Sequence, residues 1–257
     1  MTVYWLEQTA HDVPASNDWL HPNEAARLAA MRFPKRRDDW RLGRWTAKHA
    51  LAAYQSAAPA LHQIEIRAAA SGAPEVFLND QAAPFVISIS HRDNRAICAI
   101  APAGTALGCD LEIVEPRTQT FAADYFTPEE QALVEQAAPT ARPAMLALIW
   151  SAKESALKAL REGLRLDTRS VIVTLPPADA SEWHPLVVRS VDGRIFPGWW
   201  QQTENIVRTL VSDPPVNVPI RGAGTPACWT GTLAGPGERN SPLALRVERT
   251  EISPSPA

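Results

Sequence analysis

The chain has 257 residues, of which 46% are hydrophobic, and it carries a net charge of −3. This length is enough for one large core or two smaller ones, so composition leaves the number of domains open. The slightly acidic balance argues against a general nucleic-acid-binding protein, whose phosphate contacts need an excess of lysine and arginine.

The cysteines and the N-terminal segment indicate where the protein works. Cys98, Cys109 and Cys228 are widely spaced and form no CxxC pair. This usage suits a reducing compartment and argues against a structural zinc site. The N-terminus lacks a basic stretch followed by an apolar one, and no run is long enough to span a bilayer. We expect a soluble, monomeric, cytoplasmic protein with no membrane contact.

The first third of the chain predicts a strand followed by two helices. Residues 3–6 form the strand, Pro22 introduces a helix over 23–31, and 33–54 form a longer helix. Four cations recur at helical spacing along one stripe of the longer helix: Arg37, Arg41, Arg44 and Lys48. Such a stripe is often a solvated surface, but four cations without interleaved acids also suit an anion site. Both interpretations stay open at this point.

A series of strands is expected next. Apolar alternation predicts strands over 64–67 and 76–78 and a hairpin formed by 85–90 and 96–100. A strand over 106–114 carries Asp110 and Glu112 two positions apart, so both carboxylates lie on one face of the sheet. An exposed edge strand would also explain two alternating acids. The neighbouring residues are largely apolar, however, and favour a buried strand.

The second half mixes helices with further strands. Thr127 is expected to cap a helix with Pro128 at its first position. Pro143 is expected to begin the helix that carries residues 150–158, and Gly163 to end it. Strands follow over three segments: 170–175, 186–191 and 205–211. The remaining segment, 214–257, has eight prolines and five glycines, and we expect it to be mostly disordered.

An internal echo suggests how the elements are organised. Trp45-Thr46-Ala47-Lys48-His49 parallels Trp150-Ser151-Ala152-Lys153-Glu154, and each copy lies in the longest helix of its half. We therefore predict an α+β fold that is a pseudo-dimer of two similar halves, each with an antiparallel sheet packed against a long helix. The expected divisions are 1–104, 105–213 with the metal site, and the tail 214–257. A cleft between the halves is the natural ligand site.

Three acids carry the candidate chemistry. On a helix, Trp150, Glu154 and Lys158 lie at i, i+4 and i+8, and Glu154 with Lys158 could be no more than a surface ion pair. Read together with Asp110 and Glu112, however, Glu154 completes an oxygen-donor set that suits Mg²⁺ and a phosphate better than zinc. No phosphate-binding GxxxxGK[ST] loop, dinucleotide GxGxxG motif or GxSxG nucleophile motif is present. The candidate cations for the phosphate are Lys153, Lys158, His91, Arg41, Arg44 and Lys48.

The order of these motifs resembles that of the 4′-phosphopantetheinyl transferases of the long, surfactin-synthetase-activating type. Gly108-Cys109-Asp110-Leu111-Glu112 matches the family's G-x-D-x-E motif, and residues 150–158 match its W-x-x-K-E-x-x-x-K motif. Phe126 with Glu130 matches a Phe-x-x-x-Glu element, and Ser90-His91 matches the start of a Ser-His-Ser motif. The resemblance runs from about residue 5 to about residue 212. Two departures stand out: Arg92 replaces the third residue of Ser-His-Ser, and Ala73 replaces a lysine expected near the nucleotide 3′-phosphate.

The resemblance implies a transferase that moves the phosphopantetheine arm of coenzyme A to a serine of an acyl, peptidyl or aryl carrier protein. It assigns Mg²⁺ to Asp110, Glu112 and Glu154, with Glu154 also a candidate base and Lys158 a stabiliser of pyrophosphate charge. These two roles of Glu154 compete, because a metal-bound carboxylate is a poorer base. Coenzyme A is assigned to Arg41, Arg44, Lys48, Ser90, His91, Lys153 and Lys158. The alternatives are a non-catalytic coenzyme A or carrier-protein binder and a Mg²⁺-dependent pyrophosphatase.

Overall fold

The computed structural model describes residues 1–55, 59–118, 120–162, 165–177 and 182–222, which belong to one compact unit, Met1–Gly224. The first elements are β1 (Tyr4–Thr9), η1 (Ala10–Asp12), α1 (Pro22–Ala29), α2 (Pro34–Tyr54), η2 (Leu61–Gln63), β2 (Ile64–Ala68), β3 (Pro74–Leu78), β4 (Gln81–Ala82), β5 (Phe85–Arg92) and β6 (Arg95–Pro102). Those that follow are β7 (Ala106–Ile113), α3 (Phe121–Tyr125), α4 (Pro128–Gln136), α5 (Arg142–Ala159), η4 (Thr168–Ser170), β8 (Val171–Thr174), β9 (His184–Ser190), β10 (Ile195–Thr203), β11 (Ile206–Asp213) and β12 (Ile220–Arg221).

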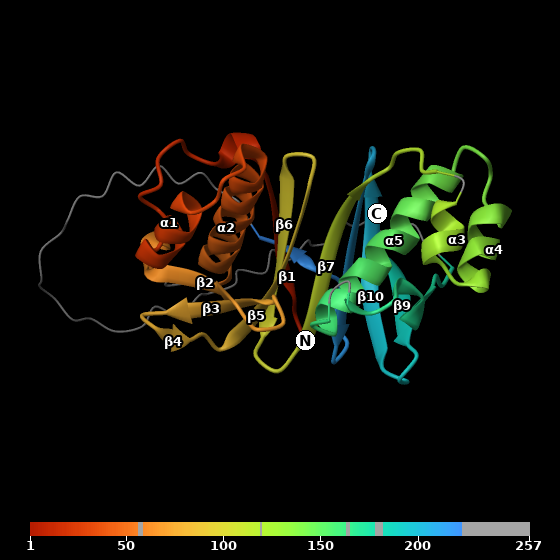
Figure 1. Ribbon diagram of the computed structural model, residues 1–257. Helices are drawn as coiled ribbons and strands as arrows, with labels where there is room; N and C mark the ends of the chain where they lie inside the picture. The colour runs from red at the N-terminus through yellow and green to blue at the C-terminus, as the bar shows by residue number, and fades with distance from the viewer. Residues whose placement is uncertain (56–58, 119, 163–164, 178–181, 223–257) are drawn as a thin grey trace, which may run out of the picture. The chain divides into compact units, whose positions relative to one another are not determined.

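The unit is built as helix, sheet, sheet and helix (Figure 1). The first sheet has the strand order β12-β1-β6-β5 and the second β7-β11-β10-β9-β8, while β2, β3 and β4 form a small third sheet. Helix α2 covers the outer face of the first sheet and α5 the outer face of the second. The predicted α+β class is confirmed.

Apolar alternation along the strands explains these layers. In β1 and β6, Trp5, Ile97 and Ala99 face the core between the two sheets, whereas Leu6 and Cys98 face α2. The same period of two places one set of β7 side chains in the core between the sheets and the other set against α5. Asp110 and Glu112 belong to the set that faces α5, so the prediction that they share one face is confirmed.

Gly108 lets β7 and α5 approach unusually closely. A Cβ atom built on Gly108 would lie 1.7 Å from the backbone oxygen of Ser155 and 3.0 Å from the backbone nitrogen of Ala159. Two residues further along β7, Asp110 reaches Lys158 of the same helix. The missing side chain at Gly108 therefore sets the distance between the strand that carries Asp110 and the helix that carries Glu154.

Most predicted elements are confirmed, including Thr127 as the N-cap of α4 and Pro128 at its first turn. The sequence analysis missed β10, whose Pro197-Gly198 pair is atypical of a strand, although Gly198 allows close approach to the Leu210 backbone. Helix α5 ends at Ala159, and the predicted stop at Gly163 lies outside the described residues.

The expectation of disorder is wrong for residues 214–222. The backbone nitrogen of Asn217 donates to Met1 O, Trp199 Nε1 donates to Val216 O, and β12 pairs in parallel with β1. These bonds tie the segment after the last strand of the second sheet to the edge of the first sheet. The remainder of the predicted tail, 223–257, lies outside the described residues.

Within the described ranges, no helix is both long and apolar enough to cross a membrane.

Replacing Gly108 with alanine is expected to force β7 and α5 apart. The new methyl group would overlap the Ser155 carbonyl, and overpacking of this kind destabilises a protein by about 1–3 kcal/mol. Thermal unfolding followed by circular dichroism measures the loss. Gly43→Ala is the matched control, because its Cβ would meet only Ile89 Cγ2 at 3.5 Å inside a helix, and alanine there should be neutral or stabilising. Equal melting temperatures for the two variants would contradict the role of Gly108.

Candidate functional site

Asp110 is the centre of a buried polar cluster between β7, β5 and α5. Its Oδ1 atom accepts hydrogen bonds from Ser90 Oγ at 2.7 Å and from Lys158 Nζ at 2.7 Å. The side chain is almost fully buried, and its Oδ2 atom is a buried oxygen without a hydrogen-bond partner. An unpartnered carboxylate oxygen in a buried position is costly unless a ligand completes it. This atom is the clearest sign of a binding site in the described residues.

Glu112 is held in place by three donors. Its Oε1 atom accepts from Trp150 Nε1 at 3.1 Å and its Oε2 atom from Arg117 Nη2 at 3.1 Å, while Arg92 Nε lies 3.8 Å away. Burial, and secondly the charge of Asp110, raise the pKa of Glu112, although both arginines oppose this. Glu112 is thus an anchored carboxylate at the rim of the cluster. An exposed edge strand, the alternative for Asp110 and Glu112, is excluded because both side chains are buried.

Glu154 faces the same cluster from α5. Burial raises the pKa of its carboxyl group, Lys158 opposes the rise, and Asp110 and Glu112 add to it. Among the described residues Glu154 makes no hydrogen bond or ion pair, and Lys158 pairs with Asp110 instead. The alternative of a plain surface ion pair between Glu154 and Lys158 is therefore wrong.

Lys158 is the cation of the cluster. It donates to Cys109 O at 3.1 Å as well as to Asp110. Burial favours the neutral amine, but the negative charges of Asp110 and Glu154 outweigh burial and raise the pKa of Lys158. The side chain is 26% exposed, so its ammonium group can meet a ligand without leaving Asp110.

The side chains of the cluster are of the type that binds divalent cations, but they are not arranged as a preformed coordination site. Three carboxylates influence one another's charge, one oxygen of Asp110 lacks a partner, and oxygen donors are those that Mg²⁺ prefers. In the described part of the chain, however, no three His, Cys, Asp or Glu side chains converge as a preformed metal site. The residues fit such an ion in donor type, because Asp110 Oδ2 is unpartnered and each oxygen of Glu112 accepts one hydrogen bond and keeps a lone pair.

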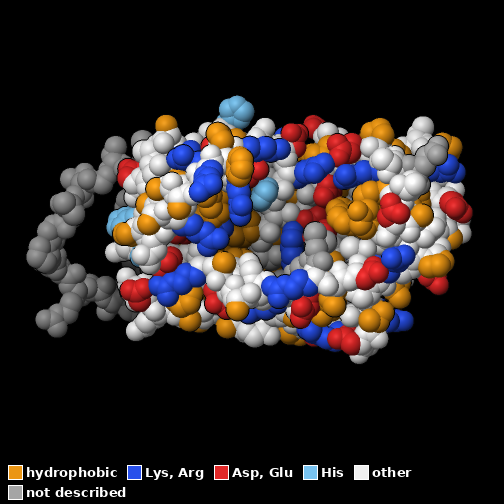
Figure 2. Space-filling model, viewed as in Figure 1, with side chains coloured by type: hydrophobic (Ala, Val, Ile, Leu, Met, Phe, Trp, Pro, Cys, Tyr) orange, Lys and Arg blue, Asp and Glu red, His pale blue; other side chains and the backbone are white. Residues whose placement is uncertain are grey.

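A basic cavity of about 530 Å³ lies between the start of α2 and the end of β5. Its charged and aromatic lining residues are Phe33, Lys35, Arg36, Asp39, Trp40, Arg44 and His91. Burial lowers the pKa of Arg44 to about 10, with Glu24 opposing and Arg27 adding to the effect, so Arg44 remains charged at neutral pH. Figure 2 shows lysine and arginine side chains gathered over α2, facing acidic side chains across a hollow. An anionic ligand suits this cavity.

A second cavity, of about 250 Å³, adjoins the cluster at Lys158. The turn Gly72-Ala73-Pro74 forms one wall and β5 another, and Arg161 lines it beyond the end of α5. Arg161 has φ of 60°, a left-handed conformation that favours glycine. Among the described residues, Arg161 makes one ion pair, and it is long: Nη1 lies 3.7 Å from Glu75 Oε1. The guanidinium group is therefore available at the cavity wall.

Two predicted anion ligands are instead buried structural lysines. The side chains of Lys48 and Lys153 are 0% exposed, and their Nζ atoms pair with Glu24 at 2.5 Å and Glu130 at 2.6 Å. Helical spacing alone placed Lys48 on the cationic stripe, because the sequence does not show that Glu24 lies opposite it. The assignment of Lys48 and Lys153 to coenzyme A is wrong for this reason.

Arg41 also has other partners than those predicted. Its Nη2 atom donates to the backbone oxygens of Pro14, Ala15 and Ser16, at 2.5 Å, 3.4 Å and 3.2 Å. Arg41 therefore fastens the loop before α1 to α2. The four residues of the predicted stripe therefore separate: Arg44 lines the cavity, Arg41 and Lys48 are structural, and Arg37 is exposed.

The remaining predicted site residues meet at the acidic cluster and the basic cavity. Asp110, Glu112, Glu154, Lys158 and Ser90 lie together in the cluster, and His91 lines the larger cavity. Sequence analysis missed Lys35, Arg36, Arg117 and Arg161. Lys35 and Arg36 precede the periodic stripe at the start of α2, and a search for basic residues near that helix start could have found them.

Comparisons with known proteins identify two similarities of sequence. Residues 106–192 match the family model described as the 4′-phosphopantetheinyl transferase superfamily. Over 167 residues the chain is 26% identical to the 4′-phosphopantetheinyl transferase HetI of Nostoc sp. (strain PCC 7120 / SAG 25.82 / UTEX 2576). This match covers 63% of the chain and 68% of the relative. The matched region 106–192 contains β7 and α5, the strand and the helix that carry the acidic cluster.

The charge of Glu154 is expected to destabilise the metal-free protein. Because folding raises the pKa of this carboxyl, its stabilising contribution is present at low pH and is lost as the pH rises through the raised value. Glu154→Gln should therefore increase the melting temperature at pH 7.5 in EDTA by about 2–4 °C, as for a gain of about 1 kcal/mol.

Glu129→Gln is the control of opposite sign. Hydrogen bonds from its own backbone N–H and from Thr127 lower the pKa of the exposed Glu129 carboxyl, so loss of its charge should lower the melting temperature. A lower melting temperature for Glu154→Gln in EDTA would contradict the inferred repulsion.

Proposed function

We propose that the protein transfers the 4′-phosphopantetheine arm of coenzyme A to a serine of an acyl, peptidyl or aryl carrier protein. The observation that carries the proposal is the position of Asp110, which has one free buried oxygen and lies beside Lys158 and Glu154. The smaller cavity adjoins this cluster at Lys158, and the basic cavity is lined by His91, which follows Ser90 in β5. The family match over residues 106–192 supports the same reaction.

The residues provide the groups that this transfer needs. The serine hydroxyl oxygen attacks the β-phosphorus of coenzyme A, the bond from that phosphorus to the bridging oxygen breaks, and adenosine 3′,5′-bisphosphate leaves with the electron pair. Glu154 accepts the serine proton, a task favoured by a pKa raised above the ordinary carboxyl value. Lys158 remains beside Asp110 and stabilises negative charge on the phosphates.

Asp110 and Glu112 would hold Mg²⁺, and Glu154 would add negative charge beside the ion while its carboxylate stays available for the serine proton. When bound, this ion supplies positive charge that neutralises phosphate oxygens. Ser90 orients Asp110 by donating to Oδ1, so that Oδ2 stays free. Trp150 and Arg117 hold Glu112 near the cluster before the ion binds. We assign the proton-accepting role to Glu154 because, among described residues, it alone of the three acids has no hydrogen-bond partner.

The cavities would bind coenzyme A. In the larger cavity, the predicted ligands Arg44 and His91 are kept for its phosphates, and Lys35 and Arg36 take the place of Arg41, Lys48 and Lys153. In the smaller cavity, Arg161 supplies the positive charge that the family resemblance places at Ala73. We further propose that the halves 1–104 and 105–213 are related by a pseudo-twofold axis, and that the protein acts as a monomer in the cytoplasm.

The direct test is incubation of the full chain with coenzyme A, Mg²⁺ and a panel of apo carrier proteins, followed by mass spectrometry. The expected result is the mass gain of one phosphopantetheine on the carrier serine. Asp110→Asn should lower the rate by more than roughly a hundredfold, because it removes one charge from the metal-binding set. The control is Asp192→Asn in the exposed turn between β9 and β10, which should keep full activity.

The assay separates the alternatives. Binding of coenzyme A without transfer to any carrier protein would identify a non-catalytic binder. Release of phosphopantetheine into solution in the absence of a carrier would identify a pyrophosphatase. Full transfer activity in Asp110→Asn would contradict the assignment of Asp110.

Arg161→Gly is expected to separate ligand binding from stability. Glycine suits the left-handed backbone at this position, so the melting temperature should stay constant or rise. Loss of the charge should raise KM for coenzyme A by about tenfold, the equivalent of one charge-assisted hydrogen bond. KM for dephospho-coenzyme A, which lacks the 3′-phosphate, should change little. Ala73→Lys in the Arg161→Gly background should restore the lost affinity, and equal losses for both donors would disprove the assignment of Arg161.

A further inference from the structure

Two lysines at equivalent positions of the sequence echo have matching surroundings. Lys48 follows Trp45-Thr46-Ala47, and Lys153 follows Trp150-Ser151-Ala152. Both are fully buried and paired with glutamates that are at most 3% exposed. Such a pair is strongly destabilised when one partner is removed, because a buried charge is then left alone.

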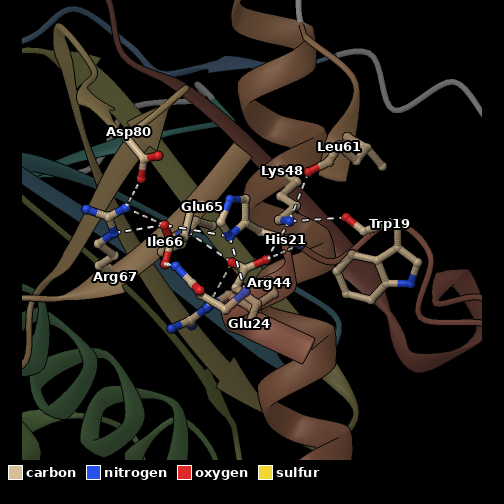
Figure 3. A network of polar contacts seen from close by, with 11 residues as sticks. Trp19, His21, Glu24, Arg44, Lys48, Leu61, Glu65, Ile66, Arg67 and Asp80 are labelled. Atoms are coloured by element: carbon tan, nitrogen blue, oxygen red, sulfur yellow. Dashed lines mark hydrogen bonds and ion pairs between the residues drawn. The ribbon is translucent and has the colours of Figure 1, made fainter. Parts of the chain in front are cut away.

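In the first half, Glu24 connects three elements (Figure 3). It is the third residue of α1, where its Oε2 atom accepts from the backbone nitrogen of His21 at 3.1 Å. Its Oε1 atom accepts from the backbone nitrogen of Ile66 in β2 at 3.0 Å. Lys48 of α2 completes the arrangement by donating to the backbone oxygens of Trp19 and Leu61 at 3.2 Å and 2.9 Å.

In the second half, Glu130 makes the same set of bonds. It is the third residue of α4, and its Oε2 atom accepts from the backbone nitrogen of Thr127 at 2.8 Å. Its Oε1 atom accepts from the backbone nitrogen of Val173 in β8 at 2.7 Å. Lys153 of α5 donates to the backbone oxygens of Thr168 and Val171 at 3.0 Å and 2.6 Å. Each pair therefore joins a short helix, a strand and the long helix of its half.

The neighbours of the two lysines differ. One turn before Lys48 on α2 lies Arg44, whose Nε atom is 3.9 Å from Glu24 and whose side chain lines the basic cavity. The residue after Lys153 on α5 is Glu154, which faces Asp110 together with Lys158. Fixing the lysine fixes the rotation of the helix about its axis, and hence the direction of these neighbours.

We propose that the two buried pairs are positioning pairs that serve different ligands. Glu130 with Lys153 directs Glu154 and Lys158 toward Asp110 and so governs binding of the divalent cation. Glu24 with Lys48 directs Arg44 toward the basic cavity and so governs binding of coenzyme A. The identity of both ligands rests on the proposed function.

Two matched double variants of the full chain test the proposal: Glu130→Gln with Lys153→Met, and Glu24→Gln with Lys48→Met. Both remove one buried ion pair of nearly identical geometry, so their melting temperatures in EDTA should fall by similar amounts. Binding of Mn²⁺, followed by electron paramagnetic resonance, and binding of coenzyme A, followed by calorimetry, are then measured for each. Neither measurement requires transfer activity.

We expect each variant to lose affinity for one ligand and to keep its affinity for the other. The Glu130–Lys153 variant should bind Mn²⁺ about tenfold or more weakly, as when a partner of a metal ligand is lost, and its affinity for coenzyme A should stay within about twofold. The Glu24–Lys48 variant should show the reverse. If a double variant does not fold, Glu130→Asp and Glu24→Asp, which keep the negative charge beside the lysine but shorten the side chain, take its place.

The outcomes also separate this proposal from the proposed function. Equal losses for both ligands in both variants, or losses in neither, would overturn the positioning roles. Wild-type protein that binds both ligands but modifies no carrier would count against the transferase, while the opposite losses of affinity in the two variants would still support the pairs. Wild-type protein that binds neither ligand would overturn both proposals.

Discussion

The burial of two lysine ammonium groups is the constraint on which this architecture depends. A buried charge is tolerated only when a counter-charge and enough hydrogen-bond acceptors surround it. Lys48 and Lys153 each receive one carboxylate and two backbone oxygens. Trp19 lies in the loop before α1, Leu61 and Thr168 precede strands, and Val171 lies in a strand, so satisfying the charges fixes the path of the chain. The short helices α1 and α4 are held at the same points because their first turns supply the glutamates.

The ion pair of Lys153 also positions the residues of the candidate site. Helix α5 is fixed along its rotation by Lys153 and in its distance from β7 by Gly108, where any side chain would overlap the Ser155 backbone. Because the rotation of α5 and its distance from β7 are both fixed, Lys158 reaches Asp110. Among the described residues, Glu154 has no hydrogen-bond or ion-pair partner. Burial, and secondly the charges of the neighbouring carboxylates, raise the pKa values of Glu112 and Glu154. Such electrostatic cost at a site is typical of residues kept for a ligand rather than for stability.

The sequence could predict what depends on local period and chemistry. The strand period placed Asp110 and Glu112 on one face, and the cap at Thr127 and the helix that carries Glu154 follow from standard signals. The burial of Lys48 and Lys153 could not be predicted, because helical spacing identifies a stripe but not the glutamate that lies opposite it. The strand β10 was missed because Pro197 and Gly198 disfavour strands in isolation, whereas the tertiary contact with β11 requires the glycine. Long-range partners, rather than propensity, decide these cases.

Both halves have a buried lysine, Lys48 or Lys153, at the same position of the long helix, and they differ in the residues near that lysine. In the proposed relation between the halves, β1 corresponds to β7. The last residue of β1 that pairs with β6 is Thr9, opposite Arg95, and the last residue of β7 that pairs with β11 is Ile113, opposite Ile206. Gln8 then occupies the place of Glu112, and His49 occupies the place of Glu154 in the echo. Because Gln8 and His49 are neutral, the first half has no set of carboxylates at these positions to attract a cation. Arg44 instead gives the cavity of the first half a positive charge that suits anions. The same arrangement of short helix, strand and long helix, joined by a buried ion pair, thus carries a site of opposite charge in each half. This is possible because the residues that face the ligand differ between the halves while the ion pair is kept.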